Sequence, residues 1–379
     1  MIIGIDASNI RTGGGVIHLK EILSHVPFED YGISRIAVWG EGGTLQNLPE
    51  HERITKIILP KFNGSLLKRF FWQLNKLGKE ASTLGCDVLL IPGGVYLGRF
   101  RPFVSIIQNM QVFEWPELRR EGASREGARL LLLQILQALT CLRSTGLIFL
   151  SHYCLKYFKE KWKWLISNVR PIVIRHGINN SNHKKNHKSI DLYSNENPFQ
   201  ILYVSTVKNY KHQWSLIDAV GKLRGQGYPL HLHLVGGGDQ AAIEKLKKAA
   251  ERSQKDYRFV FYHGSQIHEA TLRFYEDADL FAFPSSCEAF GISLLEAMSY
   301  GLPIACSSYG PMPEVLGEAG LFFDPMDVDS IAEALERLIL DVNLRKRLST
   351  AAMERAKLYS WQVSARDTFG FLYTIWKQA

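Results

Sequence analysis

Apolar residues occur along this chain in two series of short runs, separated by stretches with helical spacing. Short runs rich in Val, Ile, Leu and Phe are typical of strands buried on both faces of a parallel sheet. The first series comprises residues 2–6, 35–40, 54–59, 87–94, 103–109, 146–151 and 171–177. The second comprises residues 199–205, 230–238, 258–264, 279–283, 302–308 and 321–325. This alternation of strands and helices predicts an α/β protein with two doubly wound, Rossmann-like domains.

The two series are separated by residues 179–198, which are rich in Lys, Asn and Ser and lack apolar periodicity. We interpret this segment as an interdomain linker. The predicted amino-terminal domain therefore covers residues 1–180, and the predicted carboxyl-terminal domain covers residues 181–360. A length of 379 residues with 46% hydrophobic composition is sufficient for two cores.

The net charge and the cysteines bear on the protein's partners and on its cellular compartment. A formal net charge of +8 indicates anionic partners, such as nucleotide phosphates or an acidic membrane surface. The basic residues follow no nucleic-acid recognition motif, so we expect no nucleic-acid partner. The five cysteines are scattered and odd in number, which favours reduced thiols. Met1 leads directly into a strand without a secretory signal, and this predicts a cytoplasmic protein.

Three segments bear on membrane contact. The leucine-rich run from Leu130 to Leu139 is too short to span a bilayer, and we expect a buried helix there. Residues 66–79 and 155–170 mix Lys and Arg with Trp and Phe at helical spacing. Both segments fit peripheral contact with the inner face of a cytoplasmic membrane. They fit equally well as ordinary helices with one apolar side in a core.

The most distinctive local pattern follows the predicted strand 279–283. A short loop leads into a helix that begins near Gly291, with Glu288 in the loop and Glu296 about one turn inside the helix. Carboxylates accept hydrogen bonds from hydroxyls, and the amides of residues 290–292 at the helix start donate to phosphate or hydroxyl oxygens. The pattern therefore suits a sugar attached to a nucleoside diphosphate.

These residues carry a family resemblance. They are Glu288, Phe290, Gly291, Glu296, Ala297, Gly301, Pro303 and the run Pro313, Glu314 and Val315. Together they resemble the E-x7-E signature of retaining glycosyltransferases of family four (glycosyl transferases group 1), which have the GT-B fold with two domains facing a central cleft. The match is specific over residues 262–327 and looser over most of the chain, and Ala289 departs from it where the family usually has Gly. The resemblance also implies that a last helix, residues 361–379, joins the first domain.

The resemblance assigns roles to residues of this loop and helix. It implies that Glu296 binds the ribose hydroxyls of the donor and that Glu288, as a catalytic residue, binds hydroxyls of the donor sugar. The amides of Phe290, Gly291 and Ile292 would donate to sugar or phosphate oxygens. Because no residue stands out as a covalent nucleophile, our working hypothesis is front-face attack with the leaving diphosphate as base.

Residues 204–211 match the place where the family carries an arginine and then a lysine on the donor diphosphate. Lys211 corresponds to that lysine, so we predict it as a second catalytic residue. Thr206 stands where the arginine would be, beside Ser205, and both are predicted donor-binding residues. The lost positive charge implies a weaker grip on the diphosphate, or compensation by Lys208 or by a basic residue of the first domain.

Two glycine loops follow predicted strands. Gly14 and Gly15 belong to a cluster that lets the backbone approach a phosphate, which makes them candidate donor-binding residues, although a plain tight turn explains the cluster equally well. Residues 236–241 formally satisfy G-x-G-x-x-A. The next strand, however, ends in His263 and Gly264 instead of the acidic residue that binds a dinucleotide ribose. An NAD-dependent enzyme is therefore disfavoured.

Two further features bear on acceptor binding and on a metal site. Gln108 and Asn109 follow strand 103–107, where many members of the family have a histidine, and their amides can hydrogen-bond a sugar hydroxyl. His176, after the last strand of this domain, is interpreted as structural. Residues 277–279 spell D-x-D but precede a strand, so we expect no essential metal and no cofactor.

The sequence thus predicts a nucleotide-sugar-dependent retaining glycosyltransferase of bacterial polysaccharide or lipopolysaccharide biosynthesis. It would act on a hydroxyl of a cell-surface glycan or of a lipid-linked saccharide. Two alternatives stay open. A nucleotide-sugar epimerase of the same fold would convert the donor without an acceptor. A non-catalytic glycan-binding relative is favoured only by Thr206 and would bind sugar without turnover.

Overall fold

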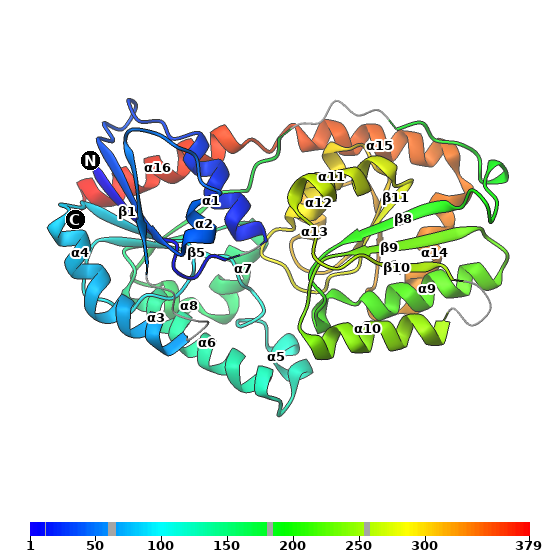
Figure 1. Ribbon diagram of the computed structural model, residues 1–379, viewed down its shortest axis with the longest axis horizontal. Coiled ribbons are helices and arrows are strands. Elements are labelled where there is room, and N and C mark those ends of the chain that lie inside the picture. Colours follow the sequence, from blue (N-terminus) through cyan, green and yellow to red (C-terminus); the bar gives the residue numbers. More distant parts are fainter. Residues whose placement is uncertain (12, 60–65, 180–184, 254–257) are drawn as a thin grey trace. The chain divides into compact units, whose positions relative to one another are not determined.

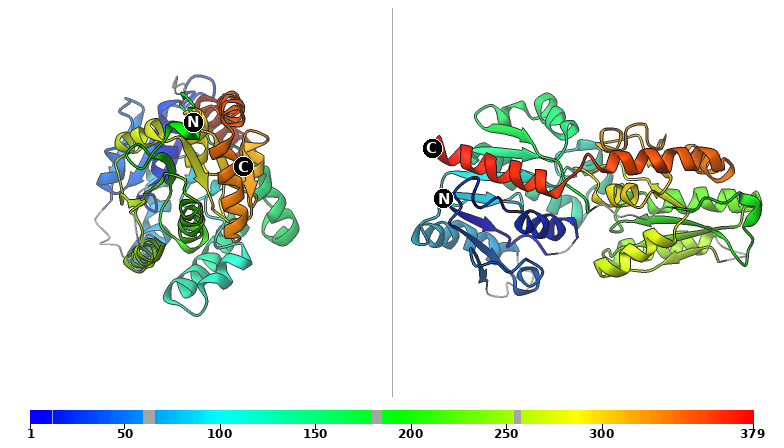
Figure 2. Two further views of the ribbon diagram at one scale, coloured as in Figure 1. Left: turned by 90° about the vertical axis from the view of Figure 1, so that its right-hand side faces the viewer. Right: turned by 90° about the horizontal axis from the view of Figure 1, so that it is seen from above.

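The computed structural model describes residues 1–11, 13–59, 66–179, 185–253 and 258–379. The chain divides into two units, each built on one parallel sheet with helices on both faces (Figures 1 and 2). Unit 1 comprises Met1–Gly177 together with Ser360–Ala379, and unit 2 comprises Ile178–Tyr359. Unit 2 is therefore inserted in the sequence between the two parts of unit 1.

The sheet of unit 1 has seven strands in the order β3-β2-β1-β4-β5-β6-β7. Every neighbouring pair is parallel, and the central strands β4, β5 and β6 are buried at every position, as the continuous apolar runs predict. The strands are β1 (Ile2–Asp6), β2 (Arg35–Gly40), β3 (Ile54–Ile58), β4 (Val88–Ile91), β5 (Phe103–Ile107), β6 (Gly146–Phe149) and β7 (Arg170–Val173). All seven strands predicted for this part of the chain are confirmed.

The helices of unit 1 fill the connections between these strands. They are α1 (Gly14–Ser24), α2 (Gly42–Leu45), α3 (Leu66–Trp72), the π-helix η1 (Gln73–Leu77), α4 (Gly78–Thr83), α5 (Trp115–Glu121), α6 (Arg125–Arg143), α7 (His152–Lys161), α8 (Lys163–Ile166) and α16 (Trp361–Lys377). Helix α16 packs on α1, β4 and β5. A Cβ at Gly146 would lie 2.7 Å from the ring of Phe371, so β6 needs glycine where α16 crosses it.

Unit 2 contains a six-stranded parallel sheet in the order β10-β9-β8-β11-β12-β13. Its strands are β8 (Phe199–Val204), β9 (Leu230–Val235), β10 (Val260–Tyr262), β11 (Leu280–Phe283), β12 (Ile304–Ser307) and β13 (Leu321–Phe323). Its helices are η2 (Ile190–Leu192), η3 (Asn209–Lys211), α9 (Gln213–Gly225), α10 (Gln240–Ser253), α11 (His268–Asp277), α12 (Ile292–Ser299), α13 (Met312–Leu316), α14 (Val328–Leu340) and α15 (Val342–Ala356). The predicted strands of the second series are confirmed as well.

The segment interpreted as a linker is in part a packed piece of unit 2, and in that part the interpretation is wrong. Residues 180–184 lie outside the described residues. Beyond them, Tyr193 donates a hydrogen bond to Oδ1 of Asp279 at 2.7 Å, and its ring contacts that of Phe199. The buried guanidinium of Arg345 donates to the carbonyl of Lys188. These contacts hold the polar segment against the sheet and α15.

The expectation of a buried helix at Leu130–Leu139 is wrong for one face of α6. Leu131, Leu132, Ile135 and Leu139 are exposed there. Of the two basic aromatic segments, residues 155–170 bury Trp162 and expose Trp164 on α8. None of the helices formed by the described residues combines the length and apolar character that a bilayer-spanning segment needs.

Candidate functional site

The strand order of unit 2 defines where a ligand site is expected. Strand β8 has two neighbours in the sheet. The next strand along the chain, β9, pairs with one edge of β8, and β11 pairs with its other edge. Loops diverge at such a switch point and leave a crevice beyond the carboxyl ends of the strands. The loops after β8 and β11 meet there, because the amide of Ser286 donates to the carbonyl of Tyr210 at 2.8 Å. This contact joins the two segments in which the sequence predicts catalytic residues.

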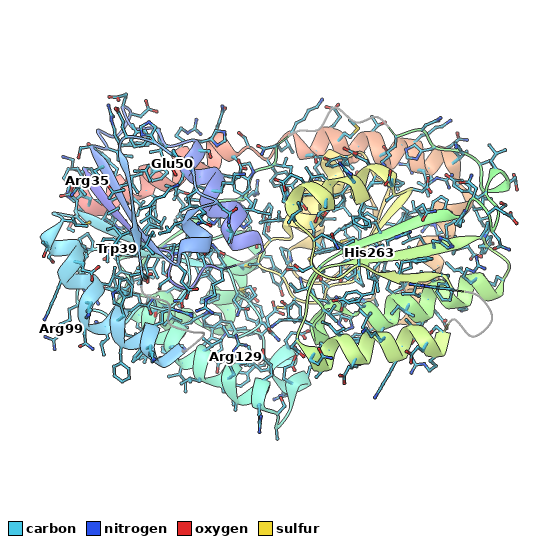
Figure 3. The ribbon with its side chains drawn as sticks, in the orientation of Figure 1. Arg35, Trp39, Glu50, Arg99, Arg129 and His263 are labelled. Atoms are coloured by element: carbon cyan, nitrogen blue, oxygen red, sulfur yellow. The ribbon has the colours of Figure 1, made fainter. Side chains whose placement is uncertain are left out.

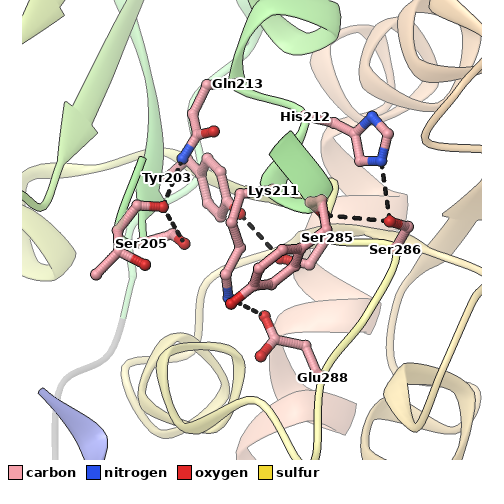
Figure 4. A network of polar contacts seen from close by, with 10 residues as sticks. Tyr203, Ser205, Lys211, His212, Gln213, Ser285, Ser286 and Glu288 are labelled. Atoms are coloured by element: carbon pink, nitrogen blue, oxygen red, sulfur yellow. Dashed lines mark hydrogen bonds and ion pairs between the residues drawn. The ribbon is translucent and has the colours of Figure 1, made fainter. Parts of the chain in front are cut away.

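Lys211 and Glu288, the two predicted catalytic residues, form an ion pair across these loops (Figure 4). Their side chains are only 10% and 15% exposed, so the pair is mostly shielded from water. The Lys211 ammonium also lies 5.0 Å from the ring centre of Tyr210 and 6.0 Å from that of Phe283. A cation held between aromatic rings and one carboxylate is positioned to exchange that carboxylate for an anionic ligand.

Hydroxyl groups fix the loop after β11. Tyr203 on β8 has its hydroxyl 2.9 Å from Oγ of Ser285, and Nε2 of His212 lies 3.0 Å from Oγ of Ser286 (Figure 4). His212, which directly precedes α9, adopts a left-handed conformation with φ of 49° and is the one described non-glycine residue with positive φ. This uncommon backbone conformation turns the chain so that Lys211 and His212 reach different parts of the neighbouring loop.

Gly291 directly precedes α12 and has a φ of 101°, a conformation that only glycine adopts without strain. The carbonyl of Gly291 accepts from the amides of Leu294 and Leu295. Helix geometry leaves the first amides of α12, starting at Ile292, without intrahelical partners. Phe290 is buried, with its ring 5.6 Å from that of Tyr359. The loop therefore presents a helix amino terminus beside Glu288.

Glu296 lies one turn inside α12 and is 7% exposed. Oε2 of Glu296 accepts a hydrogen bond from the hydroxyl of Tyr275 at 2.8 Å, and Oε1 lies 4.0 Å from Nδ1 of His268. Burial raises the pKa of this carboxyl, while Tyr275 and His268 act in the opposite direction. A buried carboxylate with one directed donor retains acceptor capacity for further hydroxyls.

The predicted donor residues Ser205 and Thr206 lie in the loop after β8. The carbonyl of Thr206 accepts from Nε2 of Gln213 at 2.9 Å and from Oγ of Ser205 at 3.2 Å, while the residue itself is exposed. A Cβ at Gly236 would come within 2.1 Å of the Ser205 carbonyl. Gly238 pairs with Val207 as an isolated bridge. The glycines after β9 thus allow close packing of two backbones, which explains the G-x-G-x-x-A pattern without a dinucleotide.

Unit 1 has a pocket of about 270 Å³ at its own switch point, between β1 and β4. It is lined by Asn9, Ile10, Arg11, Gly15, Pro92, Gly93, Gly94, Gln108, Asn109 and Gln137. The structure therefore brings together three of the predicted residues, Gly15, Gln108 and Asn109. Gly14, the remaining predicted glycine, is the first residue of α1 and does not line the pocket.

Polar residues that the sequence did not single out complete this pocket. A Cβ at Gly93 would lie 2.6 Å from Cβ of Asn9, so glycine is required for the wall to close. Arg69, 4% exposed, donates from Nη1 to Oδ1 of Asn9 at 2.9 Å. Arg11 pairs with Glu41 at 2.6 Å. The signal that could have found Asn9 and Arg11 is their place just beyond the carboxyl end of β1.

A buried histidine pair lies directly behind Gln108. Nε2 of Gln108 is 3.1 Å from Nδ1 of His18, so the amide donates to an unprotonated ring nitrogen. The His18 ring contacts those of His176 and Trp361, with centroids 4.6 Å and 5.9 Å away. Burial lowers the pKa of His18 to about 4. Burial also lowers the pKa of His176, and the charge of His18 adds to this effect.

These pKa values predict an acid-sensitive unit 1. His18 binds a proton near pH 6.5 in the unfolded chain but only near pH 4 in the folded protein. The stability that neutral His18 contributes is therefore fully present above pH 6.5 and is lost as the pH falls toward 4. From His18 alone we expect a loss of about 2 kcal/mol between pH 7.5 and pH 5. Urea unfolding at several pH values between 5 and 7.5 measures this change in the free energy of unfolding.

The variant His18→Asn should show a shallower pH dependence of the unfolding free energy. The exposed His152 on α7 supplies the control, His152→Asn, which should keep the wild-type slope. Equal slopes for wild type and His18→Asn would contradict a neutral buried His18.

The D-x-D sequence at residues 277–279 has a structural explanation. Oδ2 of Asp279 accepts from the amide of Gln200 at 2.8 Å, and Oδ1 accepts from Tyr193. Asp279 thereby ties β8 and the segment before it to β11. Within the described ranges, no three His, Cys, Asp or Glu residues are grouped as metal ligands would be.

Comparison with known proteins relates the second half of the chain to one family. Residues 184–355 match the family model described as glycosyl transferases group 1. O-antigen chain mannosyltransferase B from Escherichia coli is 32% identical over 170 residues, covering 44% of this chain and 44% of the relative. D-inositol 3-phosphate glycosyltransferase from Corynebacterium jeikeium is also 32% identical over 170 residues, covering 43% of this chain and 40% of the relative. The matches thus span less than half the length of these curated relatives.

Solved structures resemble the chain over its whole length. Sucrose-phosphate synthase from Thermosynechococcus elongatus superposes with a TM-score of 0.75 at 16% identity, covering 100% of both chains. Anabaena Alr3699/HepE, in complex with UDP-glucose, gives a TM-score of 0.70 at 18% identity, covering 99% of this chain and 100% of the other. At these identities the likeness shows the fold, which is the predicted GT-B pair of Rossmann-like domains.

Proposed function

We propose that the protein is a retaining glycosyltransferase, because its residues 184–355 match the model of the glycosyl transferases group 1 family. It moves a sugar from a nucleotide-sugar donor to a hydroxyl of a cell-surface glycan or a lipid-linked saccharide. The observation that carries this proposal is the ion pair of Lys211 and Glu288 beside the amino terminus of α12. The pair lies at the switch point of unit 2, where α/β sheets bind ligands.

The donor is proposed to separate this ion pair. A diphosphate offers Lys211 a stronger partner than one carboxylate, since each phosphate carries several acceptor oxygens. Glu288 is then released to accept hydrogen bonds from hydroxyls of the donor sugar. Glu296, one turn along α12, accepts from the ribose hydroxyls. The crystallised complex of Anabaena Alr3699/HepE with UDP-glucose, a protein of this fold, supports a nucleotide-sugar as donor.

The proposed transfer step is front-face attack, which the family resemblance implies. The bond from the sugar's anomeric carbon to the diphosphate breaks, and a bond from the same carbon to the acceptor oxygen forms on the same face. The acceptor proton passes to an oxygen of the leaving diphosphate. Lys211 and the first amides of α12 stabilise the charge that develops on that diphosphate. A product of inverted anomeric configuration would contradict this step.

The acceptor is proposed to bind the pocket of unit 1. Gln108 and Asn109 line it with amides that donate to and accept from sugar hydroxyls, and Arg11 adds a positive charge. His18 orients Gln108 through the 3.1 Å contact described above. The mannosyltransferase relative, named for O-antigen chains, supports a saccharide acceptor.

Nucleotide binding tests the donor site. One nucleoside diphosphate or nucleotide-sugar should stabilise the wild type by about 2.7 kcal/mol at a hundredfold excess over its Kd. Glu296→Ala should weaken this binding by about 1.5 to 3 kcal/mol, because a charged hydrogen bond to the ribose is lost. Thermal-shift titration against a panel of nucleotides measures both.

The matched control is Tyr275→Phe, which removes the internal donor to Glu296 but keeps the carboxylate. It should bind the same nucleotide about as well as wild type. If Glu296→Ala also bound it equally well, the ribose role of Glu296 would be wrong. A donor consumed without any acceptor would favour the epimerase, and binding without turnover would favour the glycan-binding relative.

A further inference from the structure

Helix α6 exposes a row of large aliphatic side chains, while its buried side includes the polar residues Gln134, Gln137 and Thr140. Leu131, Leu132, Ile135, Leu139 and Leu142 are between 41% and 57% exposed. They are spaced by one, three, four and three residues, which places them along one side of a helix. Five large aliphatic side chains in one exposed row are unusual on a soluble surface, where apolar residues are normally scattered singly.

The buried side of α6 is fixed by polar contacts. Gln134 donates from Nε2 to the carbonyl of Val112 at 2.7 Å. The hydroxyl of Thr140 accepts from the amide of Tyr96 at 2.9 Å. A rotation of α6 that turned its exposed leucines inward would break these hydrogen bonds. Breaking them would destabilise the fold, because a buried polar group without a partner costs free energy. The outward apolar row is therefore a fixed property of the fold.

Aromatic and basic residues lie on α6 and on the neighbouring helices α5, α7 and α8. α6 packs against α5 and α8 at the periphery of unit 1 (Figures 1 and 2). Trp115 on α5 stacks on Trp162, which in turn contacts Trp164 on α8, and both outer tryptophans are exposed. Helices α5 to α8 carry nine Lys and Arg residues against four Glu. Arg129, labelled in Figure 3, lies exposed on α6 itself.

We propose that the exposed face of α6, with Trp115 and Trp164, is a docking surface for an anionic lipid bilayer. Aliphatic side chains enter the boundary between headgroups and acyl chains, tryptophans sit at the headgroup level, and Lys and Arg bind anionic headgroups. The excess of positive charge selects this occupant over a second copy of the chain. A symmetric contact through α6 would bring two positively charged surfaces together.

The position of α6 connects this surface to the acceptor pocket. Gln137, on the buried side of α6, lines the pocket and lies within 3.2 Å of where a Cβ on Gly94 would be. The pocket wall and the apolar row are therefore on opposite sides of one helix, which is about 10 Å across. Resting on the proposed function, this arrangement assigns the acceptor to the class of saccharides carried on a membrane lipid.

Vesicle flotation of the full-length protein tests the surface. Wild type should bind vesicles of phosphatidylcholine with phosphatidylglycerol, and bind pure phosphatidylcholine less. The triple variant Leu132→Gln/Ile135→Gln/Leu139→Gln should lower the partition coefficient about 100-fold, because three side chains no longer enter the bilayer. The control, Leu192→Gln/Leu340→Gln/Leu358→Gln, replaces three exposed leucines of unit 2 and should bind like wild type.

Two further measurements keep the outcomes distinct. Circular dichroism and the nucleotide-induced thermal shift of the α6 triple variant should match wild type, because the substituted side chains are exposed and belong to unit 1. A nucleotide shift absent in both proteins would overturn the proposed function but not the docking surface. Vesicle binding that the triple variant retains would overturn the docking surface. The docking surface would also be overturned if wild type were a dimer, the triple variant were a monomer, and neither protein bound vesicles.

Discussion

Lys211→Met is expected to lower kcat/KM for sugar transfer about 1,000-fold, because the leaving diphosphate loses its principal positive charge. The ion pair with Glu288 places this ammonium at the switch point of unit 2, in a mostly shielded position where a charge interacts strongly. Steady-state assay of transfer from the donor found by thermal shift measures the loss.

The control for this variant is Lys245→Met. Lys245 is an exposed lysine of the same unit, with its ammonium 3.7 Å from the centre of the Trp214 ring and 3.2 Å from Oδ1 of Asn209. We expect it to retain activity within about twofold of wild type. A Lys211→Met enzyme with nearly full kcat/KM would show that the diphosphate is held elsewhere, and Lys208 or Arg11 would then be examined.

Glu288→Gln is expected to reduce kcat/KM about 100-fold, since a neutral amide binds sugar hydroxyls more weakly than a carboxylate does. The shape of the side chain is kept, so the loss reports charge. Glu333→Gln, an exposed glutamate on α14, is the matched control and should behave like wild type. Unchanged activity in Glu288→Gln would remove Glu288 from the site.

The double variant Lys211→Met/Glu288→Gln separates structure from function. Lys211→Met alone leaves the mostly buried Glu288 carboxylate without its ion-pair partner, at a cost of about 2 kcal/mol in the free energy of unfolding. The double variant should regain most of that stability, because no charge is left behind. It should not regain activity. Recovery of both together would mean that the pair acts only as a structural support.

Part of the candidate donor site could be predicted from the sequence, because the residues concerned lie in local patterns. One short segment of sequence contains the strand before Glu288, the glycine that precedes α12 and the carboxylate one turn along the helix. The pairing of Lys211 with Glu288 is not local, since 77 residues separate them. It depends on β8 and β11 being neighbours in the sheet, which strand periodicity alone does not determine.

Helix α6 differs from the buried helix that its leucine-rich run predicts. Hydrophobic composition predicted burial, but the side of a helix that faces the core is decided by which groups find partners there. Gln134, Gln137 and Thr140 recur every three residues and lie on one side, opposite the exposed leucines. The polar spacing can be seen in the sequence. The hydrogen bond from Gln134 to the carbonyl of Val112 cannot, because it depends on the folded structure.

His18 illustrates a residue that the sequence could not identify. It occupies a core-facing position of α1, between residues that pack as ordinary apolar side chains. Its contacts come from Gln108 on one side and from His176 and Trp361 on the other. These partners are contributed by segments spread over almost the whole chain, so only the assembled fold brings the group together.

The insertion of unit 2 within unit 1 has a consequence for synthesis on the ribosome. The seven strands of the first sheet are complete once residue 173 has emerged, but α16, which covers β4 and β5, is made after the whole of residues 178–359. At about 5 to 20 residues per second, translation of that insert takes about 10 to 35 s. During this interval the part of the amino-terminal sheet that α16 covers, on β4 and β5, stays exposed. Its folding is therefore completed only when translation reaches the last helix.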